Sequence, residues 1–260
     1  MSKTISVLGA LAAVWLASTA SAQTASDMVA RNLEARGGAA AFDALEAVAF
    51  DGTLIFPGDF KLTYKETRAA KGGVRVDAAL QGLTLVQAHD GTSGWRINPF
   101  EGRKDAERMS DDEARSIADT GSVRGPLLSA ARDGSTVTYL GREDFDGTDA
   151  YKLKVAQKDG DAFVFLLDPD SMLEIKMTET RKVRGAQKVF EYEYGDYEKV
   201  GGVYFPMSIE NWSQGQDNQR QRTVIASATA NPPVTPALFA QPASPAAAPG
   251  AAPAAAPQGK

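Results

Sequence analysis

The chain has 260 residues, a formal net charge of −5, one histidine and no cysteine. The acidic balance argues against nucleic acid, whose binding requires clustered lysine and arginine, and against electrostatic docking on an anionic membrane. Disulfides, thiol chemistry and cysteine-type zinc sites are excluded, and a transition-metal site lacks ligands.

The first residues predict a cleaved export signal. Lys3 supplies a positive charge, Ile5–Ala17 is apolar, and Ala20-Ser21-Ala22 has the small residues of a cleavage site. The apolar stretch is shorter than the about 20 residues that a membrane-spanning helix needs. We therefore expect residues 1–22 to be a signal peptide, residues 23–240 to form one domain, and the protein to be periplasmic.

The segment Ser26–Glu46 predicts helix. Met28, Val29 and Leu33 fall near helical spacing, but Gly37-Gly38 interrupts the pattern. Two short helices are the expected result.

From Val48 the apolar residues recur with a period of two, in short runs separated by Gly- and Asp-rich turn signals. This alternation is typical of a meander of antiparallel strands with one apolar face and one wet face. It continues as far as Ile97 and returns between Val137 and Ala226. In total it predicts about eleven strands.

The segment between the two sheet regions predicts helix instead. Ser110 followed by Glu113 is a capping box, and a second helical piece covers Pro126–Arg132 and ends at Asp133-Gly134. After the last strand, residues 241–260 are almost entirely alanine and proline, which predicts a disordered tail.

The fold class that these elements predict is mainly β (α+β): a curled antiparallel half-barrel of about eleven strands, with a few helices covering the concave face. So long a sheet must curl, close or split, and the helices are short for the apolar face they must cover. Either a hydrophobic cavity remains under the helices, or the core is fully packed by its own side chains. The candidate ligand-binding residues are Phe56, Leu62, Tyr64, Trp95, Ile97, Ile117, Leu127, Phe163, Phe165, Met177, Tyr192, Tyr194 and Phe205.

Catalytic chemistry finds little support. A Ser-His-Asp triad would have to use His89 with Ser93 and Asp90, which lie within one strand and turn where side chains rarely converge. No G-x-S-x-G sequence is present. We expect no catalytic residue and no enzyme activity, and His89 is interpreted as a polar residue at a strand end.

Metal and cofactor sites are also not expected. Residues 143–147 and Asp168-Pro169-Asp170 contain carboxylates, but neither matches a calcium-binding loop, and turn chemistry explains both. Paired carboxylates for glycoside hydrolysis are not indicated, because Glu174, Glu191 and Glu193 are predicted on the wet face of their strands. Arginines in the helical segments are candidates for an anionic headgroup, although surface placement is the simpler expectation; they are Arg31, Arg36, Arg124 and Arg132.

Four turn and strand motifs carry a family resemblance: Ala35-Arg36-Gly37-Gly38, Asp90-Gly91-Thr92-Ser93-Gly94-Trp95 with Asn98-Pro99, Leu166-Leu167-Asp168-Pro169, and Gly201-Gly202-Val203-Tyr204-Phe205-Pro206. With the order of elements, the chain resembles the periplasmic lipoprotein-carrier superfamily of the LolA and LolB type, over roughly residues 25–242. The likeness is greatest to the outer-membrane lipoprotein-sorting proteins. It implies an unclosed barrel with helices across its mouth.

The resulting hypothesis is a periplasmic carrier, involved in outer-membrane biogenesis, that binds a lipid or an acylated lipoprotein in a hydrophobic cavity under helical lid segments. The alternative is a lipid-sensing or protein-interaction module of the cell envelope with the same fold. Expected partners are acyl chains and, for either hypothesis, an inner- or outer-membrane protein. The protein is predicted to be a monomer without cofactors.

Overall fold

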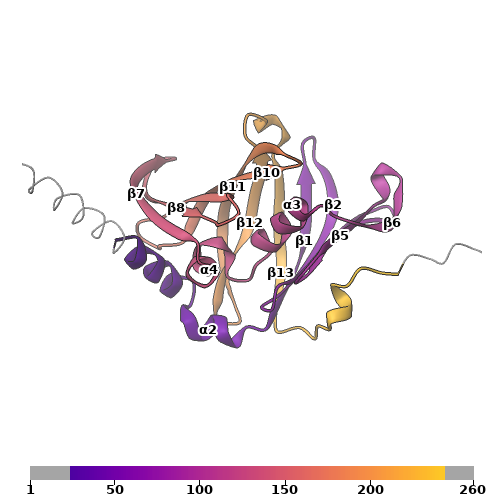
Figure 1. Cartoon of the computed structure of the whole chain (residues 1–260), viewed down its shortest axis with the longest axis horizontal. Helices are drawn as coiled ribbons and strands as arrows, with labels where there is room; N and C mark the ends of the chain where they lie inside the picture. Colours follow the sequence, from indigo (N-terminus) through magenta and orange to yellow (C-terminus); the bar gives the residue numbers. More distant parts are fainter. Residues whose placement is uncertain (1–23, 244–260) are drawn as a thin grey trace, which may run out of the picture.

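A computed structural model describes residues 24–243, which form a single open antiparallel sheet of thirteen strands with helices packed on it (Figure 1). The predicted signal peptide and almost all of the Ala/Pro tail lie outside these residues. The strands are β1 (Ala47–Phe56), β2 (Phe60–Ala69), β3 (Gly73–Leu80), β4 (Leu83–Asp90), β5 (Gly94–Asn98), β6 (Arg103–Arg108), β7 (Thr136–Phe145), β8 (Thr148–Ala156), β9 (Ala162–Leu167), β10 (Glu174–Val183), β11 (Ala186–Val200), β12 (Val203–Ser213) and β13 (Gln221–Ala230).

The sheet consists of two meanders placed side by side. Strands β1 to β6 follow one another outward from the centre, and β13 to β7 do the same on the other side, with β1 paired to β13 between them. The chain between β6 and β7 therefore runs from one edge of the sheet to the other. The helices α3 (Asp111–Thr120) and α4 (Gly125–Asp133) lie in that connection, so the topology places them across the sheet (Figure 1).

The sheet is curved, as the two ion pairs of Glu113 on α3 show. Its carboxylate lies 3.2 Å from Arg96 on β5 and 2.9 Å from Arg184 in the turn after β10. These two strands are eight positions apart in the strand order, which would be roughly 38 Å in a flat sheet with strands about 4.8 Å apart. One side chain contacts both because the sheet bends around the helix.

The predicted helices are confirmed, and α4 ends at Asp133 before Gly134 as expected. Residues 24–35 and α2 (Gly38–Ala44) form two short helices separated at Gly37. The capping box at the start of α3 is present, with the Ser110 hydroxyl accepting from the Glu113 backbone and the Glu113 side chain accepting from Ser110. Short 3-10 turns complete the structure; they are Pro99–Glu101, Asp217–Gln219 and Pro236–Leu238. None of the helices between residues 24 and 243 is long and apolar enough to cross a membrane.

Two of the sequence motifs meet where the N-terminal helices contact the sheet. The Tyr204 amide donates to the Arg36 carbonyl at 2.8 Å, and Arg36 Nε donates to the Tyr204 carbonyl at 2.7 Å. A side chain at Gly37 would clash with the Gly202 carbonyl, and Gly37 has a φ of 123°, so this close approach requires glycine. The contact fixes the N-terminal helices at one end of the concave face.

Three hydrophobic clusters stabilise the fold, and they do not all lie on the same face. The first joins α2, β1 and β12 around Phe50 and Phe205, and the second joins the N-terminal helix and α4 to β8, β9 and β10. The third contains Val86, Ala88 and Trp95 on β4 and β5. It is covered by the C-terminal segment, because the Trp95 indole N–H donates to the Phe239 carbonyl at 2.7 Å.

The sheet has thirteen strands, where about eleven were predicted. Strand β6, with the sequence RKDAER, carries no apolar alternation, and it forms one edge of the sheet. Charged edge strands are common because charges discourage pairing with another chain. A search for alternating apolar residues cannot find such a strand.

Candidate ligand cavity between the sheet and the α3–α4 connection

A cavity of about 320 Å³ lies between the concave face of the sheet and the α3–α4 connection. Its apolar wall comes from both meanders and from the helices above them. The apolar lining residues are Phe50, Leu54, Val74, Val76, Ile117, Val123, Pro126, Phe165, Met177, Phe205, Pro206, Ile209 and Ile225. Because residues from β1 and β3 face residues from β9 and β10 across this space, the curvature of the sheet creates the cavity.

The cavity wall also contains a polar group on β2. Arg68 donates to Glu66 through Nε and Nη2, both at 2.9 Å, and the Tyr64 hydroxyl donates to the same carboxylate at 2.8 Å. Glu66 therefore accepts three hydrogen bonds. In the described part of the chain, Nη1 of Arg68 makes no hydrogen bond, and the Arg68 side chain keeps 16% of its surface exposed.

A second polar group approaches from the N-terminal helices. Arg36 Nη1 lies 3.0 Å from Glu174 Oε1, and its guanidinium also lies over the rings of Phe42 and Phe205. The Tyr197 hydroxyl donates to the Glu174 carbonyl at 2.8 Å. Arg36 and Glu174 both line the cavity, where they form a second neutral pair.

Four tyrosines line the cavity: Tyr64, Tyr192, Tyr194 and Tyr197. Burial raises the pKa of each hydroxyl, so all four remain protonated and act as donors. Tyr194 differs from the others because its hydroxyl contacts only the sulfur of Met177, at 3.7 Å. After burial, the charge of Glu174 and then that of Glu179 add to the rise in the pKa of Tyr194, and the charges of Arg68 and Arg36 partly oppose it.

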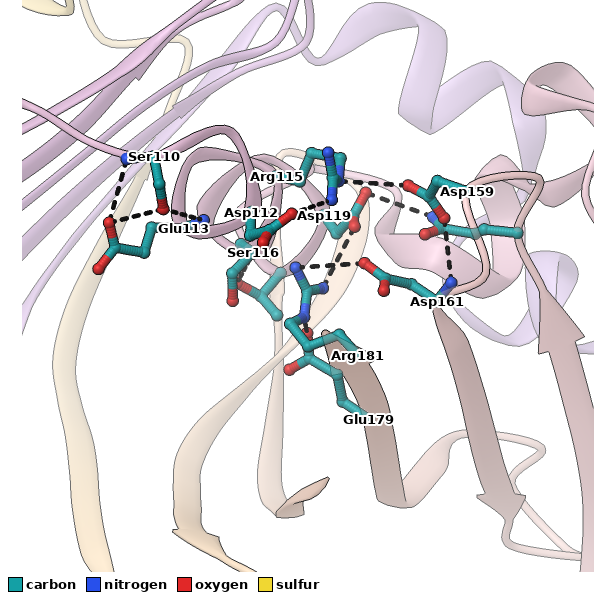
Figure 2. Close-up of polar contacts among 12 residues, drawn as sticks. Ser110, Asp112, Glu113, Arg115, Ser116, Asp119, Asp159, Asp161, Glu179 and Arg181 are labelled. Atoms are coloured by element: carbon teal, nitrogen blue, oxygen red, sulfur yellow. Dashed lines mark hydrogen bonds and ion pairs between the residues drawn. The ribbon is translucent and has the colours of Figure 1, made fainter. Parts of the chain in front are cut away.

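Beside the cavity, a cluster of charged side chains connects α3 to β10 (Figure 2). Arg181 is fully buried and pairs with Glu179, with Asp119 on α3 at 3.3 Å, and with Asp161 at 3.6 Å. The Tyr192 hydroxyl donates to Glu179 at 2.9 Å. Burial raises the pKa of all three carboxyl groups, although Arg181 opposes the shift. The cluster stabilises the docking of α3 on this half of the sheet.

Seven of the thirteen predicted ligand-binding residues line the cavity together: Tyr64, Ile117, Phe165, Met177, Tyr192, Tyr194 and Phe205. Leu127 and Phe163 lie nearby in the second hydrophobic cluster, where α4 packs on the sheet. Leu62 is buried beside Leu54, and Phe56 packs on Phe60 next to the turn of the β1–β2 hairpin. Whether any of these residues contacts a ligand stays a prediction.

The prediction that Trp95 and Ile97 belong to the same apolar surface was wrong. Both pair in register with Ala88 and Val86, whose side chains belong to the third cluster under the C-terminal segment. On β5 the side chain of Arg96 points toward α3 and forms an ion pair with Glu113. The alternation of apolar residues along a strand distinguishes the two faces of the sheet, but it does not show which face is concave.

The expected placements of Glu174 and Arg36 were also wrong. Glu174 was predicted on the wet face, but a bulge between Glu174 and Lys176 shifts the register, and Glu174 is 5% exposed on the cavity side. Arg36 was expected at the surface and is 7% exposed. Sequence reasoning missed Glu66 and Arg68 as well, although a signal existed, because both continue the apolar parity of Leu62 and Tyr64 along β2.

The turn interpretations of the remaining motifs are confirmed. Asp90 accepts hydrogen bonds from the Thr92 and Ser93 amides, both at 2.8 Å, and His89 Nδ1 accepts from the Gly91 amide at 3.1 Å. The Ser93 hydroxyl lies 3.3 Å from Asp90 and is not bonded to His89. In the described residues no group of three or more His, Cys, Asp and Glu is placed to hold a metal ion.

No family model and no curated protein matches the sequence. Solved structures do match the fold. A domain assigned to outer membrane lipoprotein-sorting proteins from Vibrio parahaemolyticus is 11% identical with a TM-score of 0.56, covering 84% of this chain and 97% of its own. A LolA superfamily protein from Nitrosomonas europaea is 12% identical with a TM-score of 0.56, covering 83% and 97%. A DUF1329 family protein from Desulfovibrio piger is 11% identical with a TM-score of 0.58, covering 85% and 97%. The chain therefore shares the fold of these three structures, one of them a LolA superfamily protein, and this agrees with the fold that the resemblance implied.

Proposed function

We propose that this chain is a carrier that binds an apolar or acylated molecule in the cavity between the concave face and α3–α4. The observation that supports it is the partly open cavity with a mainly apolar wall. Binding there is favoured by about 25 cal/mol for each Å² of apolar surface that is removed from water. Its volume of about 320 Å³ is at the lower end of the roughly 300–1,000 Å³ range of small-molecule sites. A single acyl chain fits this volume better than a lipid with several chains.

In this proposal α3 and α4 act as a lid. They lie in the connection that crosses from one edge of the sheet to the other, so a ligand enters by displacing that connection or by passing beside it. The cargo is a lipid or the acyl chain of a lipoprotein, a membrane protein of the envelope delivers or receives it, and the protein works as a monomer in the periplasm after removal of residues 1–22. No step in this role requires catalysis.

The test is binding by the full chain after delipidation, measured by native mass spectrometry and by titration with a fluorescent hydrophobic probe. An Ile117→Trp variant fills the cavity from α3 and is expected to reduce probe binding about tenfold or more. Ala118→Trp on the same helix is the matched control, because Ala118 faces the outer hollow between α3, α4 and the β8–β9 turn. Absence of lipid and of probe binding in the unmodified chain, or equal loss in both variants, would contradict the proposal.

A further inference from the structure

We propose that the cavity binds its ligand with a carboxylate group inside, held by Arg68, Arg36 and Tyr194, so that the preferred guest is a single-chain amphiphilic acid. This inference rests on the proposed function and specifies the ligand class. It follows from a comparison of the polar groups of the cavity wall that already form hydrogen bonds with those that have a donor left.

The groups that remain available are donors. Glu66 already accepts from Tyr64 and from two nitrogens of Arg68, and Glu174 already pairs with Arg36. In the described structure Arg68 uses Nε and Nη2, and Arg36 uses Nε and Nη1, which leaves one terminal nitrogen on each. An acceptor on the guest can bond to these free nitrogens, and a carboxylate is the planar acceptor that matches guanidinium donors best.

Tyr194 supplies the third donor. Its hydroxyl has only a weak sulfur partner, and it stays protonated because burial raises its pKa. The three groups come from the N-terminal helices, from β2 and from β11, and all three line the same cavity. Independent elements of the fold thus direct spare donors into one space.

The charge balance of the cavity selects against other headgroups. Glu66 and Glu174 neutralise Arg68 and Arg36, so the empty cavity carries no net charge from these four groups. A cationic headgroup gains no bond from the free nitrogens of Arg68 and Arg36 and is repelled by both guanidinium groups. A neutral ester can accept hydrogen bonds, but bonds to a charged acceptor are roughly twice as strong.

The first experiment compares three ligands of one chain length by calorimetric titration of the delipidated full chain at pH 8: dodecanoate, methyl dodecanoate and dodecyltrimethylammonium. Dodecanoate is expected to bind about tenfold or more tightly than the ester, and the ammonium compound most weakly. Equal affinity for acid and ester would overturn this inference while leaving the proposed function intact. If none of the three binds, the proposed function and this inference both fail.

The second experiment asks whether the named residues cause the preference. Tyr194→Phe removes one spare hydroxyl and is expected to weaken dodecanoate about threefold to tenfold, and to weaken the ester less, because bonds to a neutral acceptor are weaker. Tyr139→Phe is the matched control, since Tyr139 packs on the second hydrophobic cluster away from the cavity. The double variant Glu66→Gln with Arg68→Gln avoids leaving a lone buried charge and is expected to bring the acid to the affinity of the ester. Equal weakening of acid and ester in both cavity variants would overturn the assignment.

Discussion

The concave face holds buried arginines in two different settings. Arg181 is fully buried among three carboxylates, whereas Arg68 and Arg36 each pair with a single carboxylate at the wall of a cavity. In the first setting three carboxylates surround one guanidinium, and in the second each guanidinium pairs with one carboxylate. The first setting joins α3 to the sheet, and the second is where we propose that a ligand binds.

The position of the two settings in the fold agrees with this difference. Asp119 belongs to α3, Asp161 follows the β8–β9 turn, and Glu179 and Arg181 belong to β10, so the Arg181 cluster joins the crossing connection to the sheet (Figure 2). Arg68 lies on β2, in the other meander, and Arg36 lies at the end of the N-terminal helix. Neither pairs with α3 in the described structure.

The largest effect is expected from Arg181→Met. Removal of the only cation among Glu179, Asp119 and Asp161 leaves buried carboxylates without compensation, which lowers the free energy of unfolding by about 3–5 kcal/mol. Urea unfolding followed by circular dichroism measures it. A loss below about 1 kcal/mol would mean that the cluster does not stabilise the fold.

Arg220→Met provides the control, because Arg220 also contacts three carboxylates. Glu193 lies at 3.1 Å, and Glu210 and Asp217 both lie at 3.5 Å, but the Arg220 side chain is 38% exposed. Exposed ion pairs contribute about 0–1 kcal/mol, so the expected loss is at most about 1 kcal/mol. Because both arginines contact three carboxylates, the comparison of Arg181→Met with Arg220→Met shows how burial changes the loss in the free energy of unfolding.

The sequence predicted the fold well where apolar alternation reports burial. The two meanders, the capping box at Ser110 and the helix break at Gly37 all follow from local patterns that the structure retains. The edge strand β6 was missed because its residues are charged and need no buried face. Local patterns therefore identified the other elements. They did not identify β6, because burial does not constrain the sequence of that strand.

The cavity was harder to predict than the fold, because its polar residues depend on tertiary register. A bulge turns Glu174 inward, and nothing in the alternation around it signals the shift. Trp95 has the apolar parity of its strand but is covered from the opposite side by the C-terminal segment. Arg68 and Glu66 are charged residues at positions of β2 that are in phase with the apolar residues Leu62 and Tyr64. A charged residue at such a position can be used to search for polar groups inside a β-sheet cavity.

A smaller effect is expected when the packed and the hollow parts of the concave face are compared by truncation. Leu127→Ala, at a side chain 1% exposed in the second cluster, should cost about 3 kcal/mol because a new void forms in a filled core. Ile117→Ala should cost only about 1 kcal/mol, since Ile117 already borders empty space. Urea unfolding of both variants without ligand measures the difference, and equal losses would mean that the space near Ile117 is filled.

The smallest effect expected is a pH dependence that originates in the Arg181 cluster. Burial raises the pKa of Glu179, Asp119 and Asp161 in the folded protein, so between the ordinary carboxyl range near 4 and those raised values the folded state binds protons that the unfolded chain does not. This contribution to stability is full below that window and is lost as the pH rises through it.

The measurement is the free energy of unfolding between pH 5 and pH 8 for the unmodified chain and for Glu179→Gln, which keeps a hydrogen-bonding group in place. The unmodified chain is expected to become more stable on acidification, and the variant should show a shallower slope because one of the three groups no longer titrates. Glu193→Gln beside the exposed Arg220 serves as the control and should retain the slope. If the free energy of unfolding had the same slope against pH in all three proteins, the pH dependence would originate outside the Arg181 cluster. Burial around Arg181 would then not produce the titration that distinguishes this cluster from the cavity arginines.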